Sequence, residues 1–94
     1  MEAVQAQATE HPHIVRHEGI LGGEPIVRGT RTPVRAIVEL HRQGLVAEEI
    51  AERLPHLRLA QVYDALAFAG DHAEEIERHI KANRVLESPS PAKA

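Results

Sequence analysis

The stretch that most constrains the fold of this chain is GLVAEEIAERLPHLRLAQVYDAL, residues 44–66. Apolar side chains recur there every three or four positions in two segments, Val46, Ile50 and Leu54, and then Leu59, Val62 and Leu66. This spacing places them on one face of an α-helix. Because Pro55 stands between the segments and ends the first helix, the stretch predicts a helix-turn-helix.

Within this unit, Ala51 is the small residue expected where the second helix crosses the first, and Leu57 is expected to fill the turn. Many bacterial helix-turn-helix sequences follow the pattern I-A-x-x-L-G-V-S-x-x-T-V-Y. The segment IAERLPHLRLAQVY fits it with one extra residue in the turn.

Turn residues and apolar spacing divide the rest of the chain. HIVRHEGI (13–20) and IVRG (26–29) predict a short β-hairpin across LGGEP. A helix is expected from Pro33, with Thr32 as its N-cap, to a stop at Gly44. The second motif helix is expected to stop at Gly70, and a last helix to begin after an Asp71 N-cap. We therefore predict a disordered arm (1–12), a single mainly α domain with an N-terminal hairpin and four helices (13–84), and a disordered tail (85–94).

Composition narrows the class of protein. Ninety-four residues form one small domain, and aromatic residues are only 2% of the chain, namely Tyr63 and Phe68. The apolar hairpin and Phe68 are hard to bury in so small a core, so a homodimer is expected. There is no cysteine, no apolar run of membrane-spanning length and no signal-peptide pattern, which favours a cytoplasmic protein.

The formal net charge is −3, but residues 26–46 hold four arginines against one glutamate. Any polyanion is expected to meet that window. On the second motif helix, the face opposite the apolar stripe is predicted to show Ala60, Gln61, Asp64 and Ala67. Gln61 could read adenine through paired hydrogen bonds, whereas Asp64 would face the DNA and repel it. The candidate DNA-binding residues are Arg28, Arg31, Arg35, Arg58 and Gln61; the alternative is a three-helix scaffold that contacts only protein.

The element GGEPIVRGTRTPV, residues 22–34, also has a local interpretation. Gly29 permits a turn with positive φ, and the Thr30 hydroxyl can hydrogen-bond within that turn. Arg31 could bridge to Glu39 or Glu24 and pin the hairpin to the helix, or it could contact phosphate. Both alternatives stay open from the sequence.

This element, followed by G-x-x-x-E-E-I, then P-H-L-x-L-x-x-V and A-L-A, resembles the DUF (domain of unknown function) family number 433 over about residues 13–80. The resemblance implies a homeodomain-like trihelical fold and a VapB-like antitoxin role beside a PIN-like ribonuclease toxin. Val46 and Arg58 depart from the family pattern at two helix N-caps. Gln61 keeps the far half of a capping box that Arg58 cannot complete.

Catalytic and metal sites are not expected. Of seven histidines, His11, His13 and His17 lie close in sequence, but their spacing matches no standard metal site. No nucleophile triad or phosphate-binding loop is present, so we expect neither an enzyme nor a cofactor.

The C-terminal segment could contact the metal site of a nuclease with its charged side chains. The candidate toxin-binding residues are Glu74, Glu77, Arg78, Lys81 and Arg84; the alternative is a solvated surface helix. The sequence thus predicts an antitoxin of a type II toxin–antitoxin pair that binds DNA weakly and a PIN-like toxin more tightly. The alternatives are a protein-interaction module without a DNA role and a stand-alone transcription regulator.

Overall fold

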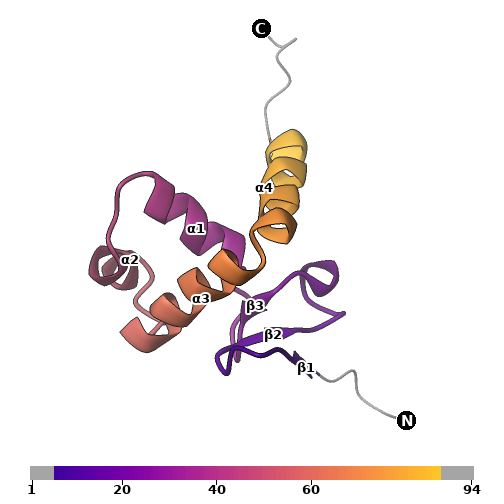
Figure 1. Ribbon diagram of the computed structural model, residues 1–94, viewed down its shortest axis with the longest axis horizontal. Helices are drawn as coiled ribbons and strands as arrows, with labels where there is room; N and C mark the ends of the chain where they lie inside the picture. The colour runs from indigo at the N-terminus through magenta and orange to yellow at the C-terminus, as the bar shows by residue number, and fades with distance from the viewer. Residues whose placement is uncertain (1–5, 88–94) are drawn as a thin grey trace, which may run out of the picture.

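The computed structural model describes residues 6–87, with side chains as far as residue 84. A three-stranded antiparallel sheet comes first, in the order β1 (Gln7–Ala8), β2 (Ile14–Arg16) and β3 (Ile26–Val27), with a 3-10 turn, η1 (Leu21–Gly23). Four helices follow in these residues (Figure 1): α1 (Val34–Arg42), α2 (Ala47–Arg53), α3 (Leu59–Asp71) and α4 (Ala73–Glu87). The predicted mainly helical chain with an N-terminal hairpin is confirmed.

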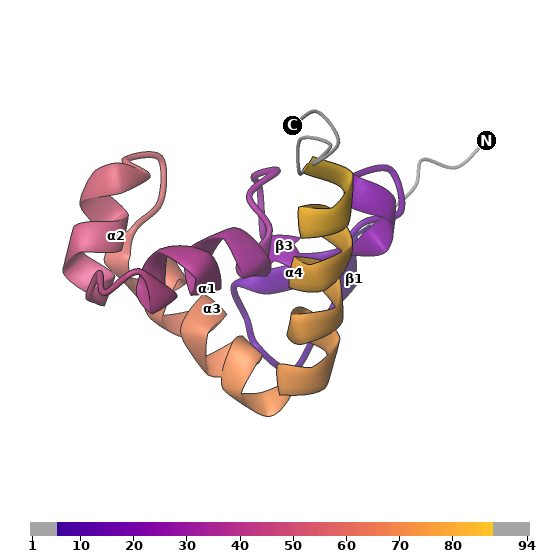
Figure 2. The same cartoon turned by 90° about the horizontal axis from the view of Figure 1, so that it is seen from above.

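The helices surround a central pair. α1 packs along α3, and α2 and α4 each contact both of these helices while lying apart from each other (Figure 2). Figure 2 shows this separation, with α2 far from α4 and the strands. β2 packs against α3, so the sheet extends the helical core.

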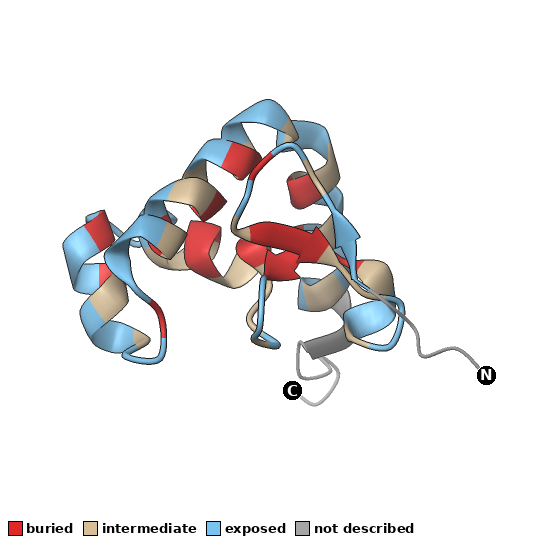
Figure 3. Cartoon of the chain, turned by 90° about the horizontal axis from the view of Figure 1, so that it is seen from below, coloured by how far each residue is buried: buried red, intermediate tan, exposed pale blue. Residues whose placement is uncertain are grey.

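The core is buried within a single chain. Figure 3 shows buried residues on the strands and on the inner faces of the helices. Phe68 is 0% exposed, and Leu57 fills the α2–α3 turn at 5% exposure, as predicted. The strand residues Ile14, Val15, Ile26 and Val27 are also buried. The hairpin and Phe68, whose apolar surface led us to expect a homodimer, are therefore buried within one chain. The homodimer itself stays a prediction.

α1 ends as its sequence predicts. Gly44 has a φ of 104°, its N–H donates to the His41 carbonyl, and the Leu45 N–H reaches back to the Leu40 carbonyl. These two bonds form a Schellman motif, which requires a left-handed residue and therefore favours glycine.

The start of α1 differs from the prediction. Pro33, not Thr32, is the N-cap, with extended φ and ψ of −78° and 151°. The Thr32 carbonyl accepts from the Val27 N–H, and the Val34 N–H donates to the Pro25 carbonyl. Pairing with β3 thus holds residues 32–33 extended and satisfies the first helical N–H without a side-chain cap.

The turn between β3 and α1 forms as expected. Gly29 has a φ of 80°. The Thr30 hydroxyl donates to the Val27 carbonyl at 2.8 Å and accepts from the Thr32 N–H at 2.9 Å. These bonds fix the turn that presents Arg31.

The junction between the last two helices also differs. α3 continues through Gly70 to Asp71, and His72 is its C-cap, with φ and ψ of −130° and 45°. Asp71 is therefore not the N-cap of α4. Its carboxylate instead contacts His11, from the N-terminal segment.

The predicted arm is wrong for residues 7–12. Gln7 and Ala8 pair with Arg16 and Val15 of β2, and His11 is buried at 9% exposure. At the other end, residues 85–87 belong to α4 rather than to a tail. The rest of the predicted arm and tail, residues 1–5 and 88–94, lies outside the described residues.

Candidate nucleic-acid interface

The four arginines of the basic window have different environments. Arg35 Nε lies 2.7 Å from Glu24 Oε2, and the two side chains are only 12% and 6% exposed. These two atoms are close but make no well-aligned hydrogen bond. Arg35 therefore joins α1 to the segment after η1, and it cannot reach a phosphate without leaving a buried carboxylate unpaired.

Arg28 is exposed, and part of its guanidinium is already hydrogen-bonded within the chain. Its Nε and one terminal nitrogen donate to the Pro12 carbonyl at 3.1 and 2.7 Å. The side chain thus ties the β3–α1 turn to the loop before β2. It lies at the surface with donors left for another acceptor.

Arg31 does not bridge to either of the acids considered for it. Arg35 pairs with Glu24, and Arg84 Nε lies 3.7 Å from Glu39 Oε2. Arg31 is exposed, and no hydrogen bond or ion pair within residues 6–87 holds its guanidinium. The bridging interpretation is wrong, and Arg31 remains available for a phosphate.

One contact brings the β3–α1 turn to the start of α3. Thr32 Oγ1 lies 2.7 Å from His56 Nε2, in the α2–α3 turn. Arg31 is adjacent to Thr32, and the exposed Arg58 is two residues after His56. The contact between Thr32 and His56 therefore brings together two chain segments that each carry an exposed arginine. We call Arg28, Arg31, His56 and Arg58 the arginine corner.

Gln61 forms the half capping box expected from the sequence. The Arg58 N–H donates to Gln61 Oε1 at 2.6 Å, and Arg58 provides no side-chain cap in return. Bidentate recognition of adenine needs both the amide oxygen and the amide nitrogen. Gln61 can therefore read a base in that way only if it releases the helix start.

The outer face of α3 is more apolar than expected. Asp64 is not on it, because the Asp64 carboxylate accepts from the His13 N–H at 2.8 Å and contacts the His11 ring. The exposed residues in the first half of α3 are Leu59, Ala60 and Tyr63, with Tyr63 50% exposed. The Tyr63 hydroxyl donates to Glu48 of α2 at 3.1 Å. This pairing with Glu48 raises the pKa of Tyr63.

The candidate toxin-binding residues on α4 divide into two groups. Glu77 accepts from Arg42 of α1 at 2.8 Å, and Arg84 faces Glu39 of α1. Pairing with Arg42 lowers the pKa of Glu77. These two residues therefore hold α4 to α1. The others, Glu74, Arg78 and Lys81, are exposed.

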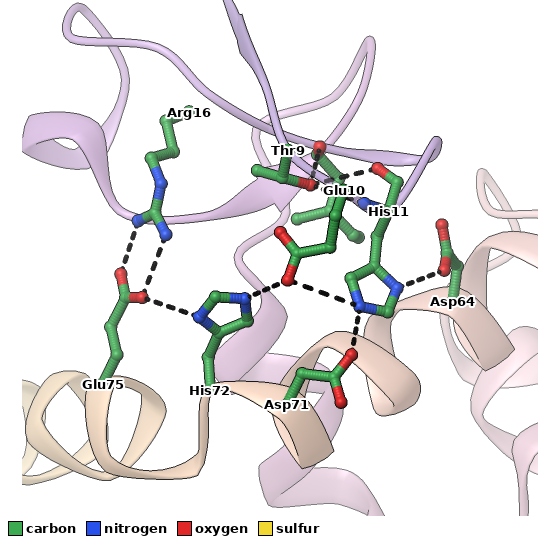
Figure 4. Close-up of polar contacts among 9 residues, drawn as sticks. Thr9, Glu10, His11, Arg16, Asp64, Asp71, His72 and Glu75 are labelled. Carbon is green, nitrogen blue, oxygen red and sulfur yellow. Dashed lines mark hydrogen bonds and ion pairs between the residues drawn. The ribbon is translucent and has the colours of Figure 1, made fainter.

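A polar cluster that the sequence did not predict lies where the N-terminal segment crosses α3 and α4 (Figure 4). His11 Nδ1 lies 2.9 Å from Asp64 Oδ1, and His11 Nε2 lies 2.8 Å from Asp71 Oδ2. Hydrogen bonding to Asp64 is the main cause that raises the pKa of His11, against the opposing effect of burial. Next to it, His72 Nε2 lies 2.6 Å from Glu10 Oε2.

The cluster rests on the aromatic ring of Phe68. The His72 ring stacks on it at 4.1 Å between centroids, and the His11 ring meets it edge-on at 5.4 Å. Arg16 lies over the same ring at 5.7 Å and forms an ion pair with Glu75. This pairing raises the pKa of Arg16 and lowers that of Glu75. His11 and Asp64 are 53 residues apart, so no local spacing could have predicted them as partners.

No helix within residues 6–87 is both long and apolar enough to span a bilayer.

Comparisons with known proteins agree with this fold. Residues 14–69 match the family described as "Protein of unknown function (DUF433)". The chain belongs to this family. It is similar to the crystal structure of a DUF433 member protein from Anabaena variabilis ATCC 29413, solved at 2.00 Å resolution. The two are 29% identical with a TM-score of 0.68, over 73% of this chain and 68% of that one. No curated protein matches the chain.

Proposed function

We propose that the protein is an antitoxin of a type II toxin–antitoxin pair, with α1–α3 acting as a homeodomain-like helix-turn-helix that binds DNA. α2 and α3 both pack on α1, as a trihelical unit requires. Leu57 plugs the turn, and Val62 and Ala65 hold α3 against the core at 0% exposure. α3 is then the recognition helix, with its N-terminal end toward the major groove.

The contact between Thr32 and His56 carries the proposal. It sets the free guanidinium of Arg31 and the exposed Arg58 at the N-terminal end of α3. Phosphates also bind well at this end of a helix, where backbone N–H groups are unpaired. Arg28 extends the corner along the β3–α1 turn, whereas Arg35 acts in packing rather than in binding.

The charge distribution sets the strength of binding. The whole chain carries −3, and α4 has Glu74 and Glu75 in its first turn, so within residues 6–87 the arginine corner is the surface that we expect to meet a polyanion. A few phosphate contacts give modest affinity that falls steeply with salt. A homodimer would present two corners, as dimeric helix-turn-helix proteins do. Light scattering that gives the mass of a monomer at tens of micromolar would reject that part.

The toxin contact is proposed for the exposed face of α4. Glu74, Arg78 and Lys81 follow one another at spacings of four and three, so they share one face of the helix. All three are exposed. The partner would be a PIN-like ribonuclease, and these charged side chains would contact its metal site. Co-expression with the product of the neighbouring gene tests this part, since the proposal expects a stable complex that Arg78→Glu disrupts.

The DNA role is tested by fluorescence anisotropy on a duplex from the region upstream of the gene and on a scrambled duplex, over a salt series. Arg31→Ala and Arg58→Ala are each expected to weaken binding to both duplexes and to flatten the salt slope by about one unit. Arg78→Ala is the matched control and should change neither. If the wild-type protein binds neither duplex at low salt, the DNA role is wrong.

A second function is favoured by the outer face of α3. Leu59 and Tyr63 are 38% and 50% exposed, and Val46 at the start of α2 is 53% exposed. A recognition helix with apolar rather than basic exposed side chains suits protein contact better than a groove of DNA. The protein would then be an interaction module. Tyr63→Ala would abolish partner binding in that case and leave any DNA binding nearly unchanged.

A further inference from the structure

Four potential metal-ligating side chains meet at the junction of α3 and α4. They are Glu10 and His11 from the segment between β1 and β2, Asp71 from the end of α3, and His72 from the junction itself (Figure 4). Donor atoms of Glu10, His11 and Asp71 all lie within 4.8 Å of one another. His72 Nε2 lies 2.6 Å from the Glu10 carboxylate. The group therefore offers two imidazole nitrogens and two carboxylates.

Three carboxylates around the His11 ring favour a positive charge at this place. One carboxylate lies at each ring nitrogen, Asp64 at 2.9 Å and Asp71 at 2.8 Å, and Glu10 is 4.0 Å from Nε2. A neutral imidazole has only one N–H. If Nδ1–H faces Asp64, the lone pair of Nε2 faces Asp71. A cation between Nε2, Asp71 and Glu10 would turn that repulsion into coordination.

The distances within this group suit a small ion. Zinc bonds of about 2.0–2.2 Å in a tetrahedron place neighbouring ligand atoms about 3.4 Å apart. Around His11 Nε2 the carboxylate oxygens lie at 2.8 and 4.0 Å, on either side of that value. Asp71 and Glu10 are 62% and 56% exposed, so both can turn toward an ion without disturbing the core.

We propose that Glu10, His11, Asp71 and His72 bind a divalent transition-metal ion of the zinc class. Mixed imidazole and carboxylate ligands suit zinc better than magnesium or calcium, which prefer oxygen alone. None of these four residues belongs to the arginine corner, although Arg28 of that corner donates to the carbonyl of Pro12, the neighbour of His11. Zinc binding can be measured without DNA, so the two proposals are tested separately.

Asp64 contacts the ring nitrogen of His11 that would not bind the metal. In the tautomer with its proton on Nδ1, His11 donates to the Asp64 carboxylate at 2.9 Å and presents the lone pair of Nε2 to a metal. A carboxylate behind a ligating histidine is the usual way in which proteins fix the ring and its tautomer. The second Asp64 oxygen accepts from the His13 N–H at 2.8 Å, so Asp64 is itself held in place.

The ion would fasten the N-terminal segment to two helices. His11 and Glu10 precede β2, whereas Asp71 and His72 form the bend between α3 and α4. Metal binding to the folded state stabilises it by mass action. The angle between α3 and α4, and with it the position of the exposed face of α4, would then depend on the metal.

The proposal is tested by titrating untagged full-length protein, stripped with a chelator, with zinc chloride in a calorimeter. One ion per chain is expected, with magnesium chloride giving no comparable heat. Glu10→Gln and Asp71→Asn keep side-chain size at exposed positions and should each weaken zinc binding at least tenfold. Asp64→Asn should weaken it by about 10–100-fold. Glu74→Gln and His41→Gln, on exposed groups outside the cluster, are the matched controls and should bind as the wild type does.

A second readout does not depend on affinity. In ¹H–¹⁵N spectra of the histidine rings, zinc should shift the Nε2 resonances of His11 and His72 and leave that of His41 in place. The proposal is overturned if the wild-type protein takes up no zinc. It is equally overturned if Glu10→Gln and Asp71→Asn bind zinc as the wild type does, or if the shifted rings are those of other histidines.

Discussion

Arg35 and Glu24 form an ion pair that is nearly closed to solvent, with Nε and Oε2 2.7 Å apart and the side chains 12% and 6% exposed. Removing one partner of such a pair leaves the other charge unpaired in the interior. Arg35→Ala is therefore expected to lower the free energy of unfolding by about 3–5 kcal/mol, measured by urea denaturation.

A double variant separates burial of charge from loss of packing at this pair. Glu24→Leu with Arg35→Met removes both charges and should recover most of the lost stability. If Arg35→Ala weakens DNA binding and leaves stability unchanged, Arg35 acts on DNA as the sequence first suggested, and the packing role is wrong.

The close approach of α3 to its neighbours depends on a small side chain. Ala65, on α3, is 0% exposed, whereas Ala51, the small residue that the sequence predicted at the crossing on α2, is only partly buried. Ala65→Leu overpacks the core and should destabilise the fold by about 1–3 kcal/mol, more than Ala51→Leu does. Thermal melts of both variants check the order. Equal melting temperatures would mean that the helices are not tightly packed at Ala65.

Asp64 fastens the N-terminal segment to α3, through the His13 N–H and the His11 ring. Asp64→Ala leaves both partners without an acceptor, at a cost of about 1–3 kcal/mol. In chelator-treated protein, hydrogen exchange at residues 7–16 should accelerate while the inner turns of α1 stay protected. Unchanged exchange at His13 would contradict the contact, and Glu74→Ala serves as the control.

The ion pair of Arg42 with Glu77 has a pH signature. Arg42 lowers the pKa of Glu77 in the folded chain, so the pair adds stability above the unfolded pKa and loses it as pH falls through the folded one. NMR titration should find the Glu77 pKa below its ordinary value, and nearer to it in Arg42→Ala. Arg31→Ala should leave it unchanged. An ordinary Glu77 pKa in the wild-type protein would show that α4 is not tied to α1 there.

The helices could be predicted because their signals are local. The three- and four-residue spacing of Leu59, Val62 and Leu66 and the stop at Gly44 depend only on neighbours in the chain. The half capping box at Gln61 is also local, and it forms as expected. The helix ends were less certain: Gly70 stays helical because α3 runs on to Asp71.

The N-terminal segment could not be predicted, because β1 has only two residues and pairs across a loop. No periodicity can appear in so short a strand. Its order comes instead from His11, whose partners Asp64 and Asp71 are 53 and 60 residues away.

The choice of ion-pair partners was equally beyond the sequence. Glu24 was one of two acids considered as partners of Arg31, but it pairs with Arg35, because α1 begins only at Val34 and Arg35 lies in its first turn. The composition of residues 26–46 shows a basic window. Only the structure distinguishes the exposed Arg31 from Arg35, whose side chain is 12% exposed and pairs with Glu24.

The arginine corner as a DNA contact is tested most directly by adding duplex DNA to ¹⁵N-labelled protein at low salt and mapping the shifted backbone amides. The shifts are expected at residues 28–32 and 56–61, joined by the contact of Thr32 with His56, and they should shrink as salt is added. Arg31→Ala and Arg58→Ala should reduce them. Shifts confined to α4, or none at any salt concentration, would contradict the account.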